Sequence, residues 1–342
     1  MKRIIPLCLA LIMTVGLLAG CGKQNEQTAS DETRLRVVTT IFPEYDWVRE
    51  ILGDKADNAE VTMLLDNGAD LHSYQPTADD IIKISECDLF IYVGGESDDW
   101  VDDALKNAAN KNMKVINLLE ALGERVKTEE VVEGMQEEDH DHDHDREDTD
   151  EHGDAKEHDH EEEAEYDEHV WLSLKNAQTL CSAISSVLQQ IDPDNKDTYA
   201  ANASAYIKKL SALDADYQAA VNAAACKTVL FGDRFPFRYL AEDYGLRYYA
   251  AFAGCSAESE ASFETISFLA GKVDELNLPC VLTIEGVQHK IAETIVRNTA
   301  AKNQKVLMMD SMQSTTSKDA ANGTTYLSVM ERNLSVLKEA LG

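Results

Sequence analysis

Histidines and acidic residues gather in the middle of this sequence, where they could bind metal ions. His169 stands directly before the apolar residues Val-Trp-Leu, at the end of a long run of acids. Six more histidines alternate with acids earlier in that run: His140, His142, His144, His152, His158 and His160. Imidazole and carboxylate groups are zinc ligands, and histidine-rich tracts bind transition metals. The pattern predicts metal chemistry but does not tell which histidines belong to a folded site.

The acidic run is too polar to bury a core of its own. From Glu129 to Glu168 the chain has 22 acidic residues against two basic ones, and therefore carries 20 of the 32 excess negative charges. We predict a disordered loop over 129–167. Its six histidines either collect metal weakly or only belong to a solvated linker. The chain has no basic stripe, which argues against nucleic acid as a partner.

Three further side chains follow short apolar runs, which is where the ligand-binding residues of open α/β sheets lie. His72 comes after "VTMLL", Asp233 ends "VLFGD" and Glu285 follows "PCVLTI". A lone loop histidine is more often solvated than a ligand, but a carboxylate next to a buried strand needs a partner. Together with His169, these groups suit zinc, or manganese or iron if more oxygens join.

Other residues near these positions could line the same site, but we predict none of them as ligands. They are His289, Cys255, Glu260, Glu44 and Tyr45. The seven cysteines include no C-x-x-C pair, so a zinc ribbon or a redox motif is not indicated. A disulfide between Cys226 and Cys280 is one interpretation, because each opens an apolar run in the same half of the chain.

Alternating strands and helices must position these residues. Eight short apolar runs predict strands at 34–42, 59–65, 87–95, 113–119, 227–233, 246–252, 279–286 and 304–310. Helical patterns between them favour parallel βαβ units. The stretches "TTIFPEYDWVREILGD" and "GDRFPFRYLAEDYGL" echo each other faintly, which fits two related lobes. Because ligands bind beyond the carboxyl ends of such strands, we expect the metal site in a cleft between two α/β lobes.

A long helix is predicted to join the lobes over 192–225. Asp192 is a plausible N-cap with Pro193 at the first helical position. Apolar side chains recur at helical spacing at Tyr199, Tyr206, Leu210, Leu213, Tyr217 and Val221. About 30 residues make a rod of roughly 45 Å, longer than one small lobe needs. The lobes would then comprise residues 35–191 and 226–342.

The first residues indicate export. Lys2 and Arg3 precede an apolar stretch that is shorter than the roughly 20 residues needed to span a bilayer. "LAGC" resembles a bacterial lipobox, which implies removal of residues 1–20 and lipid on Cys21. The polar residues 21–34 would then form a tether.

Two motifs resemble the zinc- and manganese-binding subunits of bacterial ABC transporters, lipoproteins with a rigid linking helix. "GADLHSYQPTADDI" is similar to that family's Gly-x-Asp-x-His-x-Tyr-x-Pro-Thr-x-x-Asp stretch, and "DEHVWLSLKNA" resembles its Asp-x-His-x-Trp-Leu-x-x-x-Asn-Ala stretch. The likeness runs from about Leu35 to the C-terminus. It implies that His72 and His169 are metal ligands.

The resemblance also implies two more ligands in the second lobe. The family's third ligand position falls on Arg234, and arginine has only donors and cannot bind a metal. Asp233 could substitute, or a water could complete the site. Glu285 matches the family's acidic ligand in its zinc-binding form.

The implied function is capture of Zn²⁺ by a monomeric lipoprotein, anchored outside the cytoplasmic membrane, that serves a membrane permease and its cytoplasmic ATPase. A histidine-rich loop before the Asp-x-His-x-Trp stretch resembles zinc carriers more than manganese carriers. Three alternatives stay open: Mn²⁺ or Fe²⁺ as cargo, a surface metal buffer or adhesin without a transporter, and a metallohydrolase. The last lacks an H-E-x-x-H motif, and we expect no enzyme activity.

Overall fold

A computed structural model describes residues 34–136, 165–256, 260–286 and 289–342. Contacts between residues divide the chain into two units, residues 1–35 and residues 36–342. Apart from the first residue of β1, the helices and strands of the described residues lie in the second unit. The six histidines between 140 and 160, and Cys21, lie outside the described residues.

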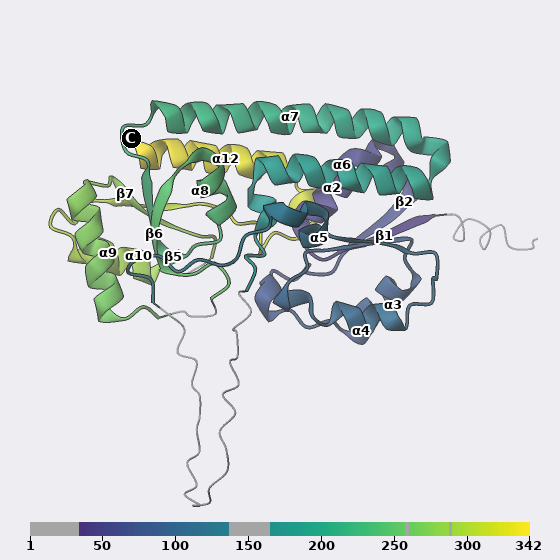
Figure 1. Ribbon diagram of the computed structural model, residues 1–342, viewed down its shortest axis with the longest axis horizontal. Coiled ribbons are helices and arrows are strands. Elements are labelled where there is room, and N and C mark those ends of the chain that lie inside the picture. The colour runs from purple at the N-terminus through teal and green to yellow at the C-terminus, as the bar shows by residue number, and fades with distance from the viewer. Residues whose placement is uncertain (1–33, 137–164, 257–259, 287–288) are drawn as a thin grey trace, which may run out of the picture. The chain divides into compact units, whose positions relative to one another are not determined.

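Two four-stranded sheets form the framework of this unit (Figure 1). Their strands are β1 (Leu35–Thr39), β2 (Ala59–Met63), β3 (Leu89–Tyr92), β4 (Lys114–Asn117), β5 (Thr228–Arg234), β6 (Arg247–Phe252), β7 (Cys280–Thr283) and β8 (Lys305–Met308). The first sheet has the order β2-β1-β3-β4 and the second β6-β5-β7-β8. β3 pairs in parallel with β1 and β4, and all three pairs of the second sheet are parallel. Each predicted strand is present, and the predicted fold of two α/β lobes is confirmed.

Helices flank both sheets and connect the strands. They are α2 (Phe42–Leu52), α3 (Ala78–Glu86), α4 (Val101–Lys106), α5 (Leu118–Leu122), α6 (Leu174–Ile191), α7 (Lys196–Ala223), α8 (Arg238–Tyr244), α9 (Phe263–Leu276), α10 (Lys290–Asn298), α11 (Ser317–Ala321) and α12 (Tyr326–Leu341). Short 3₁₀ turns lie between them, and two of these, η2 (Leu71–Ser73) and η5 (Val170–Leu172), border the site described below.

The predicted linking helix is α7, which has 28 residues and is therefore about 42 Å long. Its buried side chains include the whole predicted apolar stripe. The helix packs on α6 and α2 and also on α8 and α12, so it touches elements of both lobes (Figure 1). It begins at Lys196 rather than at Pro193, because the Asp192 side chain accepts hydrogen bonds from Asn195 and Tyr199 instead of capping the helix.

Buried polar contacts fix the lobes to each other near the site. The indole of Trp171 donates to the carbonyl of Ser311 over 2.9 Å, and the hydroxyl of Tyr326 donates to the carbonyl of Trp171 over 2.7 Å. The backbone N–H of Tyr326 donates to the buried carboxylate of Asp46 on α2. These bonds join the η5 turn, the loop after β8 and the start of α12 into one support.

The two ends of the acidic segment are ordered, so the predicted disorder is wrong for them. Thr128 and Tyr166 form an antiparallel bridge, which Glu129 N–H extends by donating to the carbonyl of Glu165. The N–H of Gln136 donates to the carbonyl of Ala251 in β6. Backbone pairing and contacts with the second lobe outweigh the polarity of these flanks. The residues between them, 137–164, are not described.

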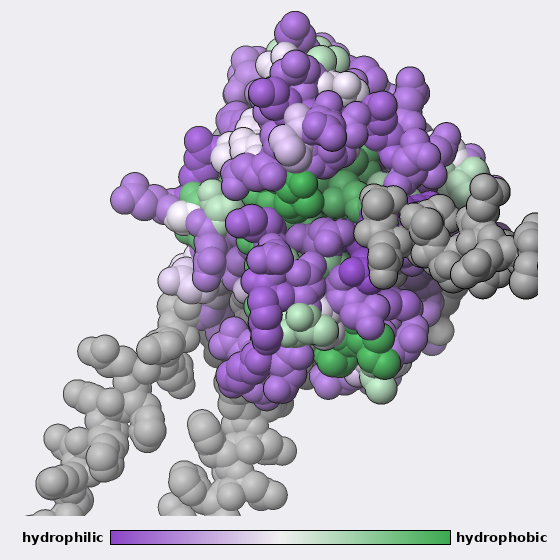
Figure 2. Space-filling model, turned by 90° about the vertical axis from the view of Figure 1, so that its right-hand side faces the viewer, coloured by the Kyte–Doolittle hydropathy of each residue, from purple (hydrophilic) through white to green (hydrophobic). Residues whose placement is uncertain are grey.

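The surface is mostly polar, as expected for a chain with two buried cores. Figure 2 shows one face on which hydrophilic residues dominate, with hydrophobic ones in a band across the middle and in a separate patch below it. Among the described residues, none of the helices combines the length and the apolar character needed to cross a membrane.

Candidate metal centre

His169 is held by the acid two residues before it. The residue lies just before η5 and is fully buried. Asp167 Oδ1 accepts from the backbone N–H of His169 over 2.9 Å and lies 3.0 Å from its ring Nδ1. Because a carboxylate oxygen only accepts, Nδ1 carries the proton and Nε2 keeps its lone pair. Such an orienting carboxylate is typical of metal-ligating histidines.

His72 belongs to η2, the turn that follows β2, and its ring is oriented in the same way. The Asp70 side chain accepts from the backbone N–H of His72 over 3.1 Å. Ring Nδ1 lies 2.9 Å from Ser97 Oγ and 3.4 Å from Glu168 Oε2, so the ring proton faces two oxygens. Burial, and after it the neighbouring His169, lowers the pKa of His72 to about 3. The ring is therefore neutral near pH 7, as a metal ligand must be.

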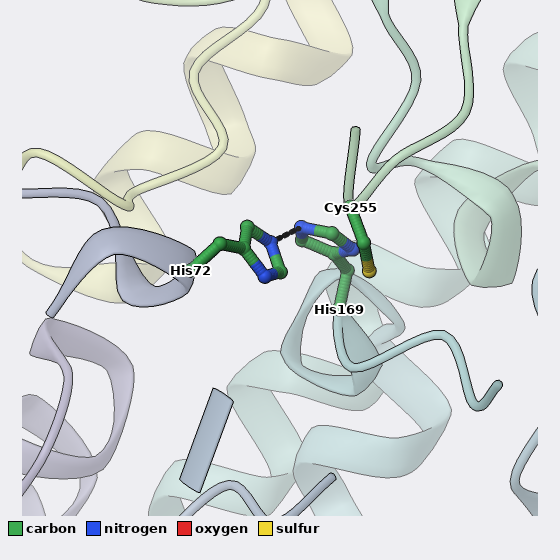
Figure 3. Close-up of side chains that lie close together, drawn as sticks. All are labelled: His72, His169 and Cys255. Atoms are coloured by element: carbon green, nitrogen blue, oxygen red, sulfur yellow. Dashed lines mark hydrogen bonds between the residues drawn. The ribbon is translucent and has the colours of Figure 1, made fainter. Parts of the chain in front are cut away.

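The free ring nitrogens of the two histidines face each other. His72 Nε2 and His169 Nε2 are 3.3 Å apart (Figure 3). Two nitrogens bound to one tetrahedral zinc at about 2.0–2.1 Å would be separated by roughly 3.3–3.4 Å. Two lone pairs that converge at this spacing suit a divalent cation. In each ring the other nitrogen contacts an oxygen, which holds the ring in this orientation. The motifs that are 97 residues apart in the chain thus meet at one point.

Glu168 supports the His72 ring from a crowded position beside the β3 loop. The N–H of Ser97 donates to Glu168 Oε1 over 2.9 Å. Gly95 has a φ of 85°, and a Cβ at this position would lie 2.3 Å from the same oxygen. Glycine is therefore required for the carboxylate to approach. Burial raises the pKa of Glu168 above its ordinary value, and Oε2 has no hydrogen-bond partner other than the His72 ring nearby.

Cys255 is the third potential ligand that the structure brings to this point, and the sequence prediction left it out. The structure places one ligand atom from each of His72, His169 and Cys255 within 4.8 Å of the other two (Figure 3). Cys255 follows β6, the second strand of its lobe, just as His72 follows β2. Glu129 accepts from its backbone N–H over 2.7 Å, and burial raises the pKa of its thiol.

Arg234, the residue at the family's third ligand position, forms an ion pair instead. Its guanidinium contacts the carboxylate of Asp70, two residues before His72. Burial alone would raise the pKa of Asp70, but the charges of Arg234 and His72 overcome this effect, and the pKa lies below its ordinary value. Arg234 therefore contributes a paired positive charge next to the imidazoles. This arrangement agrees with its exclusion as a ligand.

Asp233 is not part of the group formed by His72, His169 and Cys255. Its Oδ2 accepts from the Thr283 hydroxyl over 2.6 Å and from the N–H of Ile284, and its Oδ1 accepts from the N–H of Arg234. A register shift in β5 between Phe231 and Arg234 turns this end of the strand. The carboxylate thus ties β5 to the end of β7.

Glu285 also lies outside that group, although it follows β7 as predicted. Its Oε1 accepts from the Ser311 hydroxyl and from the N–H of Gln313, and its Oε2 accepts from the N–H of Ser311 over 2.6 Å. Oε2 keeps one acceptor site free. Burial, and after it the neighbouring Asp310, raises the pKa of Glu285.

The weaker candidates make other contacts. His289 Nδ1 lies 3.1 Å from the Thr283 hydroxyl, Tyr45 is hydrogen bonded to Arg49, and Glu44 Oε2 accepts from both backbone and side chain of Thr40. Glu260 is exposed. The five cysteines in the described part of the chain are free thiols, so Cys226 and Cys280 are not bridged.

Comparisons with known proteins point to one family. The family model described as "Zinc-uptake complex component A periplasmic" matches residues 37–340. The zinc-binding lipoprotein AdcA of Streptococcus pneumoniae is 32% identical over 339 residues, which are 99% of this chain but 61% of that protein. The high-affinity zinc uptake system protein ZnuA of Bacillus subtilis is 31% identical over 95% of this chain and 94% of its own length.

Solved structures agree with these sequence matches. The crystal structure of the Zn(II)-bound ZnuA-like domain of S. pneumoniae AdcA has a TM-score of 0.66 at 28% identity and covers 90% of this chain and 99% of that one. The metal-dependent lipoprotein YcdH of B. subtilis has a TM-score of 0.69 at 27% identity, with the same coverage. Because both the family model and these relatives span nearly all of the described fold, this chain belongs to the family of the periplasmic component A of zinc-uptake complexes.

Proposed function

We propose that this chain captures Zn²⁺ outside the cytoplasmic membrane and delivers it to a membrane permease that a cytoplasmic ATPase drives. The observation that carries this proposal is the 3.3 Å approach of two imidazole nitrogens whose rings are both oriented by oxygens. The zinc-related names of AdcA and ZnuA support zinc as the cargo, and the family name supports a role in uptake. The chain would act as a monomer.

His72 and His169 are the proposed imidazole ligands. Glu285 is the proposed acidic ligand, and its Oε2, with one acceptor site left, would bind the metal after a shift of its loop. Asp233 is the weaker candidate, because both of its oxygens already hold strand ends together. Imidazole ligands and the nearby thiol favour zinc over manganese, which prefers oxygen ligands.

A binding protein fits this site better than a metallohydrolase does. Catalytic zinc sites keep an open position for water and need a base beside it. Here the Asp167 carboxylate is hydrogen bonded to the His169 ring, and the carboxylate oxygens of Glu168 face Ser97 and the His72 ring. These acids orient ligands, so we assign them no role as a base.

Calorimetric titration with Zn²⁺ and Mn²⁺ tests the proposal. The sample is the chain from residue 22 with its six loop histidines changed to Asn, so that only the cleft contributes. We expect one tight zinc site that His72→Ala and His169→Ala each abolish. His289→Ala is the matched control, because this histidine contacts Thr283 instead of the cluster, and should bind zinc unchanged. Tighter binding of Mn²⁺ than of Zn²⁺ would refute zinc as the cargo.

The six loop histidines, His140 to His160, are proposed to collect zinc when it is scarce. Their alternation with acids offers several weak sites rather than one tight site. Deleting residues 137–164 should remove the weak binding seen in the titration and slow uptake at low zinc. Unchanged stoichiometry and unchanged uptake would refute the role.

A lipid on Cys21 is proposed to hold the chain at the membrane surface. The lipoprotein name of the AdcA relative supports this anchor. Cys21→Ala should abolish labelling of the chain by palmitate and release it into the medium. Continued labelling of the variant by palmitate would exclude Cys21 as the lipid-bearing residue.

A further inference from the structure

We propose that Cys255 is a protein ligand of the zinc site and takes the place of the ligand that Arg234 cannot provide. The centre would then combine two imidazoles and one thiolate with the proposed carboxylate of Glu285. This inference rests on the proposed function and refines its ligand set.

Position is the first argument. The two sheets have the same strand order, and His72 and Cys255 both stand in the loop after the second strand of their lobe. Ligand atoms of these two residues and of His169 come within 4.8 Å of one another, although three separate segments contribute them. In Figure 3 the Cys255 side chain lies alongside the His169 ring. Ligand atoms of one tetrahedral zinc ion lie roughly 3.3–3.6 Å apart, so the Cys255 side chain must turn toward the facing nitrogens when the metal binds.

The loop that carries the thiol is built closely against the His169 ring. A Cβ on Gly254 would lie 2.9 Å from the carbonyl oxygen of Phe235 and 3.2 Å from His169 Nδ1. Only a residue without a side chain allows this approach. On the other side, the Glu129 carboxylate accepts from the backbone N–H of Cys255 over 2.7 Å. The position of Cys255 beside the ring is therefore fixed from two directions.

The charges around the site leave room for an anionic ligand. Arg234 and Asp70 neutralise each other, and both histidines are uncharged as ligands. Zn²⁺ brings two positive charges to a buried site, and a thiolate would offset them together with the proposed carboxylate ligand of Glu285. When the thiol binds, its S–H bond breaks, a sulfur–zinc bond forms, and the proton leaves to the buffer. Thiolate is a soft ligand that selects zinc over manganese, in keeping with the proposed cargo.

Cobalt substitution tests the inference directly, because cobalt bound by thiolate absorbs in the near ultraviolet through charge transfer and cobalt bound only by nitrogen and oxygen does not. The sample is the chain from residue 22 with its six loop histidines changed to Asn. We expect one equivalent of Co²⁺ to produce the charge-transfer band. The Cys255→Ser variant should lose this charge-transfer band. It should also bind zinc at least about tenfold more weakly, because even the loss of an outer-shell partner reduces affinity by that much. Cys226→Ser is the matched control and should keep both the band and the affinity.

A second measurement needs no variant. Iodoacetamide is added to the unaltered chain with and without Zn²⁺, and each cysteine is mapped by mass spectrometry. Zinc should protect Cys255 while Cys226, also partly exposed, reacts equally in both samples. Tight metal binding without a charge-transfer band, or without protection of Cys255, would overturn this inference and leave the proposed function intact. Failure to bind cobalt and zinc at all would overturn both.

Discussion

The two lobes share a strand order but differ in what their loops hold. In the first lobe, Glu44, Asp98 and Glu168 are buried acids, and each has one oxygen without a hydrogen-bond partner. In the second lobe, Asp233 and Glu285 have both oxygens bonded to neighbouring loops. The buried acids of the first lobe therefore keep unused hydrogen-bonding capacity, whereas those of the second lobe join neighbouring loops.

The residues around the carboxyl end of the first strand of each lobe show the contrast most clearly. The first lobe has Glu44, a fully buried acid in the first turn of α2, and the second has Arg234 at the end of β5, which pairs with Asp70 of the first lobe. Burial, and after it the charge of Asp98, raises the pKa of Glu44 to about 8 from 4.5. The protonated form is thus the one that the fold accommodates.

The largest expected effect concerns the pH dependence of stability. A folded pKa above the unfolded one means that the contribution of Glu44 is complete below about pH 4.5 and is lost as the pH rises through about 8. The slope is at most about 1.4 kcal/mol per pH unit. Glu44→Gln should therefore gain stability relative to the parent chain between these values, measured by urea unfolding at several pH values. Glu60→Gln, at an exposed position of β2, is the control; the same gain there would remove the contrast between the lobes.

Glycines beside the two histidines offer the next test. Gly95→Ala should lower the free energy of unfolding by about 1–3 kcal/mol for the backbone alone, and displace Glu168 in addition. Gly254→Ala should unfold less readily than Gly95→Ala but weaken zinc binding, because its Cβ would press on the His169 ring. Gly271→Ala in α9, with open space around it, is the control and should be neutral or stabilising. Equal effects at Gly95 and Gly271 would contradict the packing described for Glu168.

Asp167→Asn addresses how the first lobe orients its ligand. An amide can donate to Nδ1 and so favours the tautomer whose Nε2 carries the proton. We expect zinc affinity to fall by about 10–100-fold, the usual effect of losing an outer-shell partner. The change is measured by titration calorimetry beside circular dichroism, which should be unaltered. An affinity within twofold of the parent would show that Asp167 does not set the tautomer.

The smallest expected effects separate the two acids of the second lobe. Glu285→Gln should weaken zinc binding by about tenfold if Oε2 binds the metal. This value is the smallest loss of affinity that removal of an outer-shell partner usually causes. Asp233→Asn should leave zinc affinity unchanged and lower thermal stability slightly, because its carboxylate joins β5 to Thr283. The reverse pattern would make Asp233 the acidic ligand and leave Glu285 as the residue that joins neighbouring loops.

Much of the architecture follows from local patterns that the sequence displays. The eight apolar runs became strands, and the stripe from Tyr199 to Val221 became the buried face of α7. Such periodicities reflect short-range geometry and burial, so they can be recognised without knowing which elements pack together. His72 and His169 could be identified for a related reason, because each stands in a distinctive motif.

The supporting roles of Asp167 and Glu168 escaped prediction. Asp167 stands two residues before His169 in the Asp-x-His-x-Trp motif, but the motif does not state its role, and Glu168 is one of 22 acids in the same run. Only the folded chain shows that both are buried and that one contacts each histidine ring.

The positions of the strands, the motif histidines and the apolar face of α7 were thus determined by the sequence itself, since each depends on residues close together in the chain. Tertiary structure alone decided that Cys255 approaches the histidines, that Arg234 pairs with Asp70, and that Glu285 binds the loop after β8. These contacts join segments from 26 to 183 positions apart. Their geometry depends on how the two lobes pack against each other, and no local pattern records that packing.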